Sequence, residues 1–425
     1  MKVLMFGWEL PPLYAGGIGM VCYDLIKELS AQGVSVTYVM PYGPDNFSSD
    51  TSAQVLIAEQ VMPAVKNVVV KPVSAMFTAY DSGTTYSTRL ETFNSTIKAP
   101  GKKDYRKNLY GSDLYSEVDL FAKRAYEIAK DVDFDVIHAH DWMTFPAAIG
   151  VKVATGKPLV VHVHNTIYDR YLGNANSMER DMEYNGLAQA DRIIAISQYV
   201  KNTIVAQYGI NPDKIEVVHN APNTLLRDRK ANKAYPRLNM GNDKVVLFTG
   251  RITVQKGPEY FVHMAKKVLE KRKDVKFIMG GTGDMFRRTV DLATHLGISD
   301  KFVFTGFYSL DQAQSLYASA DCYVMPSVSE PFGLVPLEAM EHGAPTIISR
   351  TSGVAEVASH TLKVDFWDTH QMADKVLAVL QYPALREALG QNGQRQVQAM
   401  NWTRPTNQCV GIYNQLISSN LSMRY

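Results

Sequence analysis

The sequence predicts an α/β protein of two domains, each built on a parallel β-sheet that helices cover. Short apolar runs alternate with amphipathic stretches of helical spacing along almost the whole chain, which is typical of parallel sheets buried on both faces. The 425 residues suffice for two domains of ordinary size. A polar stretch at about 223–243 divides two series of such units, and we interpret it as the linker.

The first series begins with a strand at 3–6, followed by a helix whose apolar residues recur at helical spacing. Gly33 is expected to end this helix. Further strands of the first domain are predicted at 34–40, 136–140, 159–164, 192–196 and 215–218. The stretch 46–113 is rich in Ser, Thr, Tyr and Lys and holds few periodic runs, so we expect a hairpin and loops there.

The second series supplies the strands of the second domain. We predict them at 245–250, 277–280, 302–305, 322–325 and 346–348. A helical pattern at 402–416 follows the last of them. The two halves are alike in architecture, although no short internal repeat is visible.

Composition and charge argue against several classes of function. The net charge is +2, so nothing points to nucleic acid as a partner. No apolar stretch reaches membrane-spanning length, and the N-terminal apolar run is short and ends in Gly7, which favours a first strand over a signal peptide. Cys22, Cys322 and Cys409 lie far apart and are predicted to be free thiols, as fits a reducing cytoplasm.

The segment 329–343 is the most informative part of the chain. It places two carboxylates, Glu330 and Glu338, on either side of a Phe-Gly-Leu turn that an apolar strand precedes. A strand, a glycine turn and a helix N-terminus form an anion site, because free backbone N–H groups and the helix dipole point at the bound group. Glu338 lies about two helical turns beyond Glu330, so we expect both to face one cleft. Amides for a diphosphate and carboxylates for sugar hydroxyls suit a nucleotide sugar.

This pattern resembles the signature of retaining glycosyltransferases of group 1 and family 4, whose starch and glycogen synthase branch is the best known. The resemblance extends over nearly the whole chain. It implies the GT-B fold, in which two Rossmann-like domains face each other across a cleft. The implied parts are an acceptor-side domain at 1–225, a nucleotide-sugar-binding domain at 226–404, and a C-terminal helix at 405–425 that packs back on the first domain.

The resemblance also implies a reaction. A hexose, expected to be glucose, moves from a nucleoside diphosphate sugar such as UDP- or ADP-glucose to a hydroxyl acceptor, with retention of anomeric configuration. A growing α-glucan is one acceptor, and a small molecule, a lipid or a cell-surface glycan is the alternative. No cofactor and no metal are expected, and the departing phosphate oxygen takes the acceptor's proton on the same face.

Within the segment 329–343, the resemblance assigns roles to individual residues. Glu338 is expected to hold the ribose hydroxyls, and Glu330 to lie at the donor sugar. The backbone at Gly333 and Leu334 is expected to bind phosphate, with Phe332 in the same turn.

A second motif, Gly250-Arg251 followed by Lys256-Gly257, matches the family residue for residue. It comes after the end of a predicted strand, where α/β sheets bind ligands. The nucleoside diphosphate leaves with growing negative charge. Fixed cations at Arg251 and Lys256 would therefore stabilise the transition state more than the ground state.

Two glycine turns complete the expected nucleotide-sugar site. Gly16 and Gly17 lie between the first strand and the first helix, and glycine lets the backbone approach an anion closely. In the family, the matching loop closes over the phosphates, and the turn at Gly281 lies beside the nucleotide. The chain departs from bacterial starch and glycogen synthases at Tyr14, where they carry a lysine, and this departure weakens the prediction of ADP-glucose and of glycogen synthesis.

Histidines end two successive predicted strands of the first domain. His138 and His140 share one face of their strand because side chains alternate, and Asp141 follows them. The resemblance places Asp141 along the cleft and His164 near the donor sugar. Paired His-x-His strands are also found in metal hydrolases, so a metal-dependent hydrolase is the alternative from another class. A nucleotide-sugar-binding protein without catalysis is a third interpretation, against which the intact Glu330 and cations argue.

Overall fold

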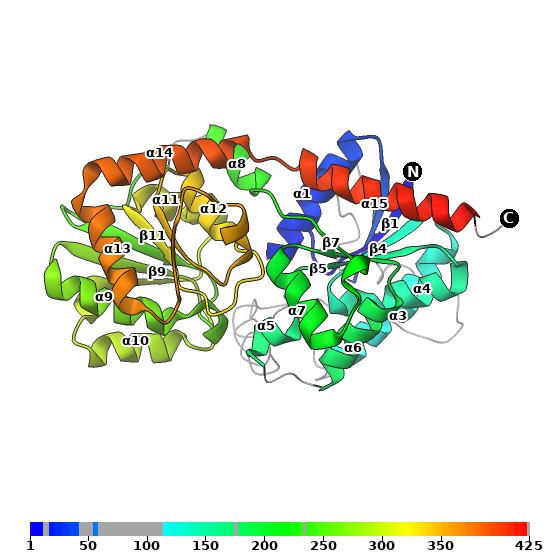
Figure 1. Cartoon of the computed structure of the whole chain (residues 1–425), viewed down its shortest axis with the longest axis horizontal. Coiled ribbons are helices and arrows are strands. Elements are labelled where there is room, and N and C mark those ends of the chain that lie inside the picture. Colours follow the sequence, from blue (N-terminus) through cyan, green and yellow to red (C-terminus); the bar gives the residue numbers. More distant parts are fainter. Residues whose placement is uncertain (12–16, 42–53, 58–113, 174–176, 233–234, 423–425) are drawn as a thin grey trace, which may run out of the picture. The chain divides into compact units, whose positions relative to one another are not determined.

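The computed structural model describes residues 1–11, 17–41, 54–57, 114–173, 177–232 and 235–422. The chain divides into two compact units (Figure 1). Unit 1 consists of Met1–Ile196, Val200–Val218 and Trp402–Tyr425, and unit 2 of Ser197–Tyr199 and His219–Asn401. The chain thus enters the main part of unit 2 at His219 and returns to unit 1 at Trp402. The boundary predicted from the sequence, 225/226, lies later in the chain than the observed one.

Unit 1 is built on a seven-stranded sheet in which neighbouring strands are parallel. The strand order is β3-β2-β1-β4-β5-β6-β7. The strands are β1 Lys2–Phe6, β2 Ser35–Met40, β3 Gln54–Ile57, β4 Val136–His140, β5 Leu159–Val163, β6 Arg192–Ala195 and β7 Ile215–Val217. The direction of the order reverses between β1 and β4, and sheets of this kind bind ligands beyond the carboxyl ends of the strands at such a point.

Two groups of helices pack in unit 1. Its helices are α1 Gly17–Ala31, α3 Leu114–Lys130, α4 Phe145–Thr155, α5 Ile167–Tyr171, α6 Ser177–Gln189, α7 Gln198–Tyr208 and α15 Thr403–Ser422, with the short 3-10 helices η1 Trp142–Thr144 and η2 Pro212–Lys214. α4 packs between α3 and α6, whereas α15 lies against α1 and β4 (Figure 1). The C-terminal helix therefore completes the unit that the N-terminal strand begins.

Local sequence explains where these elements begin and end. β4 and β5 are buried at every residue, as expected of central strands that helices cover on both faces. α4 has Pro146 in its first turn, where no N–H partner is needed, and ends at Gly156 with a φ of 65°. Gly33, with a φ of 78°, follows α1 as the sequence predicted.

Unit 2 repeats the arrangement with six strands in the order β10-β9-β8-β11-β12-β13, again with parallel neighbours. The strands are β8 Lys244–Thr249, β9 Val275–Gly280, β10 Phe302–Gly306, β11 Cys322–Met325, β12 Thr346–Ser349 and β13 Leu362–Val364. Here the direction of the order reverses between β8 and β11.

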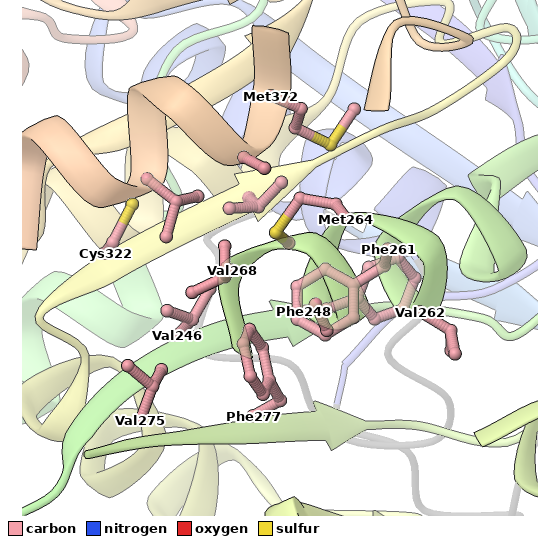
Figure 2. Packing of buried hydrophobic residues seen from close by; sticks show 14 of the residues in the cluster. Val246, Phe248, Phe261, Val262, Met264, Val268, Val275, Phe277, Cys322 and Met372 are labelled. Atoms are coloured by element: carbon pink, nitrogen blue, oxygen red, sulfur yellow. The ribbon is translucent and has the colours of Figure 1, made fainter. Parts of the chain in front are cut away.

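Helices cover both faces of this sheet. They are α8 Thr224–Asn232, α9 Pro258–Lys271, α10 Phe286–His295, α11 Leu310–Ser319, α12 Leu334–Glu341, α13 Thr369–Gln381 and α14 Pro383–Ala399, with the 3-10 helices η3 Val254–Lys256, η4 Ser299–Lys301 and η5 Gly353–Glu356. On one face, Phe248 and Phe277 of the strands pack against Phe261 of α9 and Met372 of α13 (Figure 2). Strand alternation turns Tyr323 to the other face, where α11 and α12 pack.

The structure corrects the predicted elements in three places. The stretch 223–243 was predicted to be a linker, but α8 occupies 224–232. β13 was not predicted, because three residues are too few to show a period. Within 46–113 only β3 is described, and it extends the parallel sheet beside β2; the rest of the predicted hairpin and loops lies outside the described residues.

Cys22, Cys322 and Cys409 are buried free thiols, which confirms the interpretation of the sequence. Burial raises the pKa of each thiol. Within the described part of the chain, no helix has both the length and the apolar character that crossing a membrane requires.

Phe261→Ala should lower the free energy of unfolding by about 3–5 kcal/mol, because it removes a buried ring that contacts those of Phe248, Phe277 and Phe302. Denaturant unfolding followed by circular dichroism measures the change. Phe307→Ala is the matched control, since its ring is 84% exposed and its loss should matter by less than about 0.5 kcal/mol. Equal losses in the two variants would contradict the assigned core.

Candidate active site

Two predicted motifs meet where the strand order of unit 2 reverses. β8 and β11 are neighbours, so the turns that follow them leave the same edge of the sheet. The first turn carries Arg251 and Lys256, and the second leads to Glu330. This edge is the ligand-binding position of Rossmann-like sheets.

An ion pair between Lys256 and Glu330 lies at the centre of this edge. Lys256 Nζ is 2.6 Å from Glu330 Oε2, and the Ser327 hydroxyl donates to the same oxygen at 3.0 Å. The Glu330 side chain is only 6% exposed, so this cation and this donor replace the hydration that its carboxylate loses on burial. An ammonium carries three N–H donors, so Lys256 can hold Glu330 and a bound anion at once.

The turn that carries the cations is fastened to the loop after β11. The N–H of Val328 donates to the carbonyl oxygen of Gln255 at 2.9 Å, and the Arg251 guanidinium donates to the Gln255 side chain at 3.3 Å. A Cβ on Gly257 would lie 2.1 Å from the carbonyl oxygen of Pro326, so no larger residue fits without a shift. Arg251 and Lys256 therefore stand on one turn of fixed position.

The turn after β9 is packed as closely against the turn after β8. Gly281 has a φ of +131°, and a Cβ there would lie 1.8 Å from the carbonyl oxygen of Gly250. The N–H of Gly281 donates to Gly306 O, and that of Ile252 to Thr282 O, both at 2.9 Å. The sequence analysis expected Gly281 beside the nucleotide; the structure shows that its missing side chain makes room for the neighbouring turn.

α12 begins at Leu334, directly after Gly333 in the left-handed region with a φ of 98°. The expected helical spacing of the two carboxylates is therefore wrong. Glu330 lies in the loop before the helix, and only Glu338 lies on it. The reason is that other segments hold the intervening residues outside helical geometry: the Ser197 hydroxyl donates to Pro331 O at 2.6 Å, and backbone bonds hold the residues around it.

Phe332 takes a packing position in this loop. Its ring is 2% exposed and lies 6.3 Å from the ring of His219, centroid to centroid. Its carbonyl oxygen accepts the N–H of Val354 at 2.7 Å. Phe332 therefore helps to fix the turn by its packing, and the residues that follow it, Gly333 and Leu334, are half-buried.

Glu338 is partly exposed and keeps one oxygen bonded inside the unit. The Tyr317 hydroxyl donates to Glu338 Oε2 at 2.7 Å. Burial raises the pKa of the Glu338 carboxyl, whereas hydrogen bonds from Tyr317 and Asn223 lower it. The sequence analysis did not identify Tyr317, because nothing local links it to a residue one strand away.

In unit 1, four buried histidines form a two-by-two array at the carboxyl ends of β4 and β5. The rings of His138 and His140 stack at a centroid distance of 4.4 Å, as do those of His162 and His164. Across the strands, His140 Nδ1 lies 2.9 Å from His164 Nε2, and His138 Nε2 lies 3.2 Å from His162 Nδ1. This stacking confirms that His138 and His140 share a face.

All four imidazoles are neutral at pH 7. Burial lowers the pKa of His138 and His164 to about 3, and it lowers the pKa of His140 and His162 well below the usual value. At every one of the four except His164, neighbouring histidines lower the pKa further by a smaller amount. Neutral rings can pair through one N–H donor and one acceptor nitrogen. Nε2 of His140 and of His162 is buried and finds no hydrogen-bond partner among the described residues.

The metal-hydrolase alternative depends on this array. His138, His140 and His162 can each offer a ring nitrogen within 4.8 Å of the others. Hydrogen bonds between rings already engage a nitrogen of each of the four histidines, however, so the array is accounted for as a hydrogen-bonded stack.

Asp141 follows β4 in a backbone conformation that is uncommon for a residue with a side chain, with φ 59° and ψ 167°. Its Oδ1 accepts the N–H of His164 at 2.6 Å, so the structure brings these two predicted residues together. Oδ2 is buried and has no hydrogen-bond partner in the described part of the chain. Burial raises the pKa of Asp141 to about 7.

The glycine loop of unit 1 is only partly described. Gly16 and Tyr14 lie outside the described residues, and Gly17 is the first residue of α1. Glu9 Oε1 accepts the N–H of Gly19 at 3.0 Å, so a carboxylate of the chain already occupies part of this helix N-terminus. Glu9 was not among the predicted site residues.

Two further buried contacts support the histidine array and were missed. The Tyr413 hydroxyl of α15 bonds to His138 Nδ1. Arg170 of α5 pairs with Glu183 at 2.7 Å and with Glu179 at 3.3 Å, and it donates to the carbonyl oxygen of Asn165, the residue after His164, at 3.4 Å. The i, i+4 spacing of Glu179 and Glu183 was the only sequence signal for this ion-pair group.

Comparison with known proteins points to the glycosyltransferases, which agrees with the two parallel sheets and the candidate site described above. The model of the glycosyl transferases group 1 matches residues 229–396, and that of glycosyltransferase family 4 matches residues 93–224. Sucrose-phosphate synthase from Thermosynechococcus elongatus superposes with a TM-score of 0.72 at 19% identity, covering 98% of this chain and 99% of that one. Other solved structures of similar fold hold UDP or ADP.

Two curated relatives are similar in sequence. An uncharacterized glycosyltransferase of Methanocaldococcus jannaschii is 28% identical over 435 aligned residues, which cover 97% of this chain and 98% of the relative. D-inositol 3-phosphate glycosyltransferase 1 of Catenulispora acidiphila is 27% identical over 305 residues, 67% of this chain and 73% of the relative. The chain is therefore a glycosyltransferase with the GT-B fold. Within that class its two parts are similar to the glycosyltransferases of family 4 and of group 1.

Unit 1 should lose stability steeply on acidification below about pH 6.5. Four histidines with lowered pKa values each take up a proton on unfolding, whereas Asp141, with a raised pKa, releases one between about pH 4 and 7. The net uptake of about three protons corresponds to about 4 kcal/mol per pH unit. Stability is thus present above pH 6.5 and lost as the pH falls, which denaturant titrations at several pH values would measure.

Asp141→Asn gives a matched check of this sign. The variant removes Asp141, whose release of a proton on unfolding offsets part of the uptake by the histidines. The number of protons taken up on unfolding, and with it the slope of the free energy of unfolding against pH, should therefore rise by about one proton. A shallower slope than that of the wild type would show that the raised pKa of Asp141 is wrong.

Proposed function

We propose that this glycosyltransferase moves a hexose, glucose in the first instance, from a nucleoside diphosphate sugar to a hydroxyl acceptor with retention of configuration. The bond between the acceptor oxygen and C1 forms as the bond from C1 to the phosphate oxygen breaks. The departing phosphate oxygen takes the acceptor's proton. The proposal uses no metal and no cofactor, and it places the reaction in the cytoplasm, where buried thiols stay reduced.

The Lys256–Glu330 pair is the observation that carries the proposal. Glu330 holds the ammonium in place before any donor arrives, so little reorganisation remains for the transition state. Arg251 lies on the same turn and adds a second positive charge. Two fixed cations and the N-terminal amides of α12 can together take the charge of the leaving diphosphate without a metal ion.

The remaining residues of unit 2 take roles around this pair. The amides at Gly333 and Leu334 bind phosphate, and the partly exposed Glu338 accepts the ribose hydroxyls. Glu330 has a second oxygen that Lys256 and Ser327 leave available for a sugar hydroxyl. Gly250 and Gly281 keep the turns close enough for these groups to converge.

In unit 1, His164 and Asp141 serve the sugar and the acceptor. His164 stays neutral at pH 7, because burial lowers its pKa to about 3, so it offers a hydrogen bond and no charge. Asp141 Oδ2 is a buried oxygen without a partner among the described residues, which supports a sugar or acceptor hydroxyl as its partner.

The comparisons support two kinds of acceptor. The branch that the signature resembles favours an α-glucan. The names of the inositol-phosphate relative and of sucrose-phosphate synthase favour a small polyhydroxy molecule that bears phosphate. Structures that hold UDP or ADP support these two nucleotides as parts of the donor.

A thermal-shift panel of UDP-, ADP- and GDP-sugars, with and without EDTA, tests the proposal and identifies the donor. Stabilisation by one nucleotide sugar that survives EDTA is the expected result. Product analysis with α-glucan and with small phosphorylated polyols as acceptors then distinguishes the two acceptor classes. No response to any donor, with stability that collapses in EDTA, would instead favour the histidine metal site.

Lys256→Ala and Glu330→Ala should each cut turnover by roughly 10²–10³-fold while the protein stays folded, because each removes or releases charge at the leaving group. Steady-state kinetics with the donor found by the panel measures the loss. Lys271→Ala is the matched control on α9, since this lysine is 65% exposed and pairs only across the surface with Asp374. Near-wild-type turnover in either site variant would contradict the assignment.

A further inference from the structure

Glu338 of the proposed donor site accepts a hydrogen bond from a buried tyrosine hydroxyl. Tyr317 lies on α11, is 1% exposed, and donates to Glu338 Oε2 at 2.7 Å. The carboxylate is partly exposed and also accepts a hydrogen bond from Asn223, and its two oxygens keep further lone pairs for a ligand. The hydroxyl of Tyr317 is thus one of two side-chain donors that orient this carboxylate.

Tyr317 is itself held in place on all sides. Its ring contacts that of His342 at a centroid distance of 5.5 Å. His342 Nδ1 lies 2.9 Å from the carbonyl oxygen of Glu338, and its Nε2 bonds to Gln314 Oε1. Gln314 donates to Leu226 O at 2.6 Å, which fixes the orientation of its amide. The Tyr317 side chain cannot turn away from Glu338 without breaking this packing.

Three tyrosines and one histidine lie around Glu338. Tyr308, Tyr317 and Tyr323 face Glu338 from the loop before α11, from α11 and from β11, and burial raises the pKa of each hydroxyl well above neutrality. His342 on α12 bonds to the Glu338 backbone and not to its carboxylate. A neutral tyrosine hydroxyl that donates to a carboxylate favours the ionised form of that carboxylate.

We propose that Tyr317 is a positioning residue that keeps Glu338 ionised and oriented for the two ribose hydroxyls of the donor. This inference rests on the proposed function, because it needs Glu338 to bind ribose. Glu338 must be ionised to accept two hydroxyl donors, so donor affinity falls as the pH drops through its pKa. Loss of the Tyr317 hydroxyl raises that pKa, and the acid-side fall in affinity moves to higher pH.

Calorimetric titration of UDP between pH 5 and 8.5 tests this inference with Tyr317→Phe. The variant should move the acid-side fall upward by about one pH unit and weaken UDP about 10-fold at pH 6. With 2′,3′-dideoxy-UDP, which lacks both ribose hydroxyls, the variant and the wild type should bind alike. A uniform loss at every pH, or an equal loss with the dideoxy nucleotide, would show a merely structural role and overturn the proposal.

Tyr323→Phe is the matched control. Tyr323 is also fully buried beside Glu338, but its hydroxyl donates to the carbonyl oxygen of Thr249 at 3.3 Å. This variant loses a hydroxyl from the same layer and should leave the acid-side fall at its wild-type pH. A shift as large as that of Tyr317→Phe would overturn the specific role of Tyr317.

Glu338→Gln separates the failure of this inference from that of the proposed function. The amide keeps the shape and cannot titrate, so affinity should drop and lose its acid-side fall, and Tyr317→Phe should add nothing in this background. If Glu338→Gln binds UDP as the wild type does, the ribose role of Glu338 fails. If it weakens binding while Tyr317→Phe leaves the pH profile unchanged, only the role of Tyr317 fails.

Discussion

Backbone contact between the turns that follow β8, β9 and β11 is the constraint on which the unit 2 site depends. A Cβ atom at Gly257 or at Gly281 would collide with a backbone carbonyl oxygen of the neighbouring turn. A methyl group at either position would push the turns apart by about the length of a covalent bond. Misplacement of this size is enough to cost an enzyme about 10²-fold in rate. The positions of Arg251, Lys256 and Glu330 therefore depend on glycines that have no side chain to take part in the reaction.

Unit 1 holds four polar imidazole rings in a buried environment from which water is excluded. Imidazoles that were charged there would repel one another and lose their hydration. The histidines avoid this by remaining neutral and by bonding to each other, so that one ring supplies the proton that the next accepts. Tyr413 closes one end of the array at His138. Nε2 of His140 and of His162 is buried and has no hydrogen-bond partner among the described residues.

The sequence predicted what depends on local pattern and missed what depends on distant contacts. Apolar periodicity located the strand that carries His138 and the strand that precedes Arg251, and strand alternation put His138 and His140 on one face. A three-residue strand such as β13 has no period to detect. Spacing alone suggested that Glu338 lies about two helical turns beyond Glu330. This was wrong because a hydrogen bond from Ser197, far away in the chain, helps to hold the loop before α12 outside helical geometry. Tyr317, Tyr413 and Glu9 were missed for the same reason.

The path of the chain through the two units has a consequence for biosynthesis. Unit 1 begins with β1 and is closed by α15, and the whole of His219–Asn401 is made between them. On the ribosome, unit 2 can fold while unit 1 still lacks its last helix and His138 lacks the hydroxyl of Tyr413. Until then the apolar surface of α1 that α15 covers faces water. A chain in which α15 has not yet docked, or from which it has been clipped, therefore exposes a surface that chaperones and proteases can recognise.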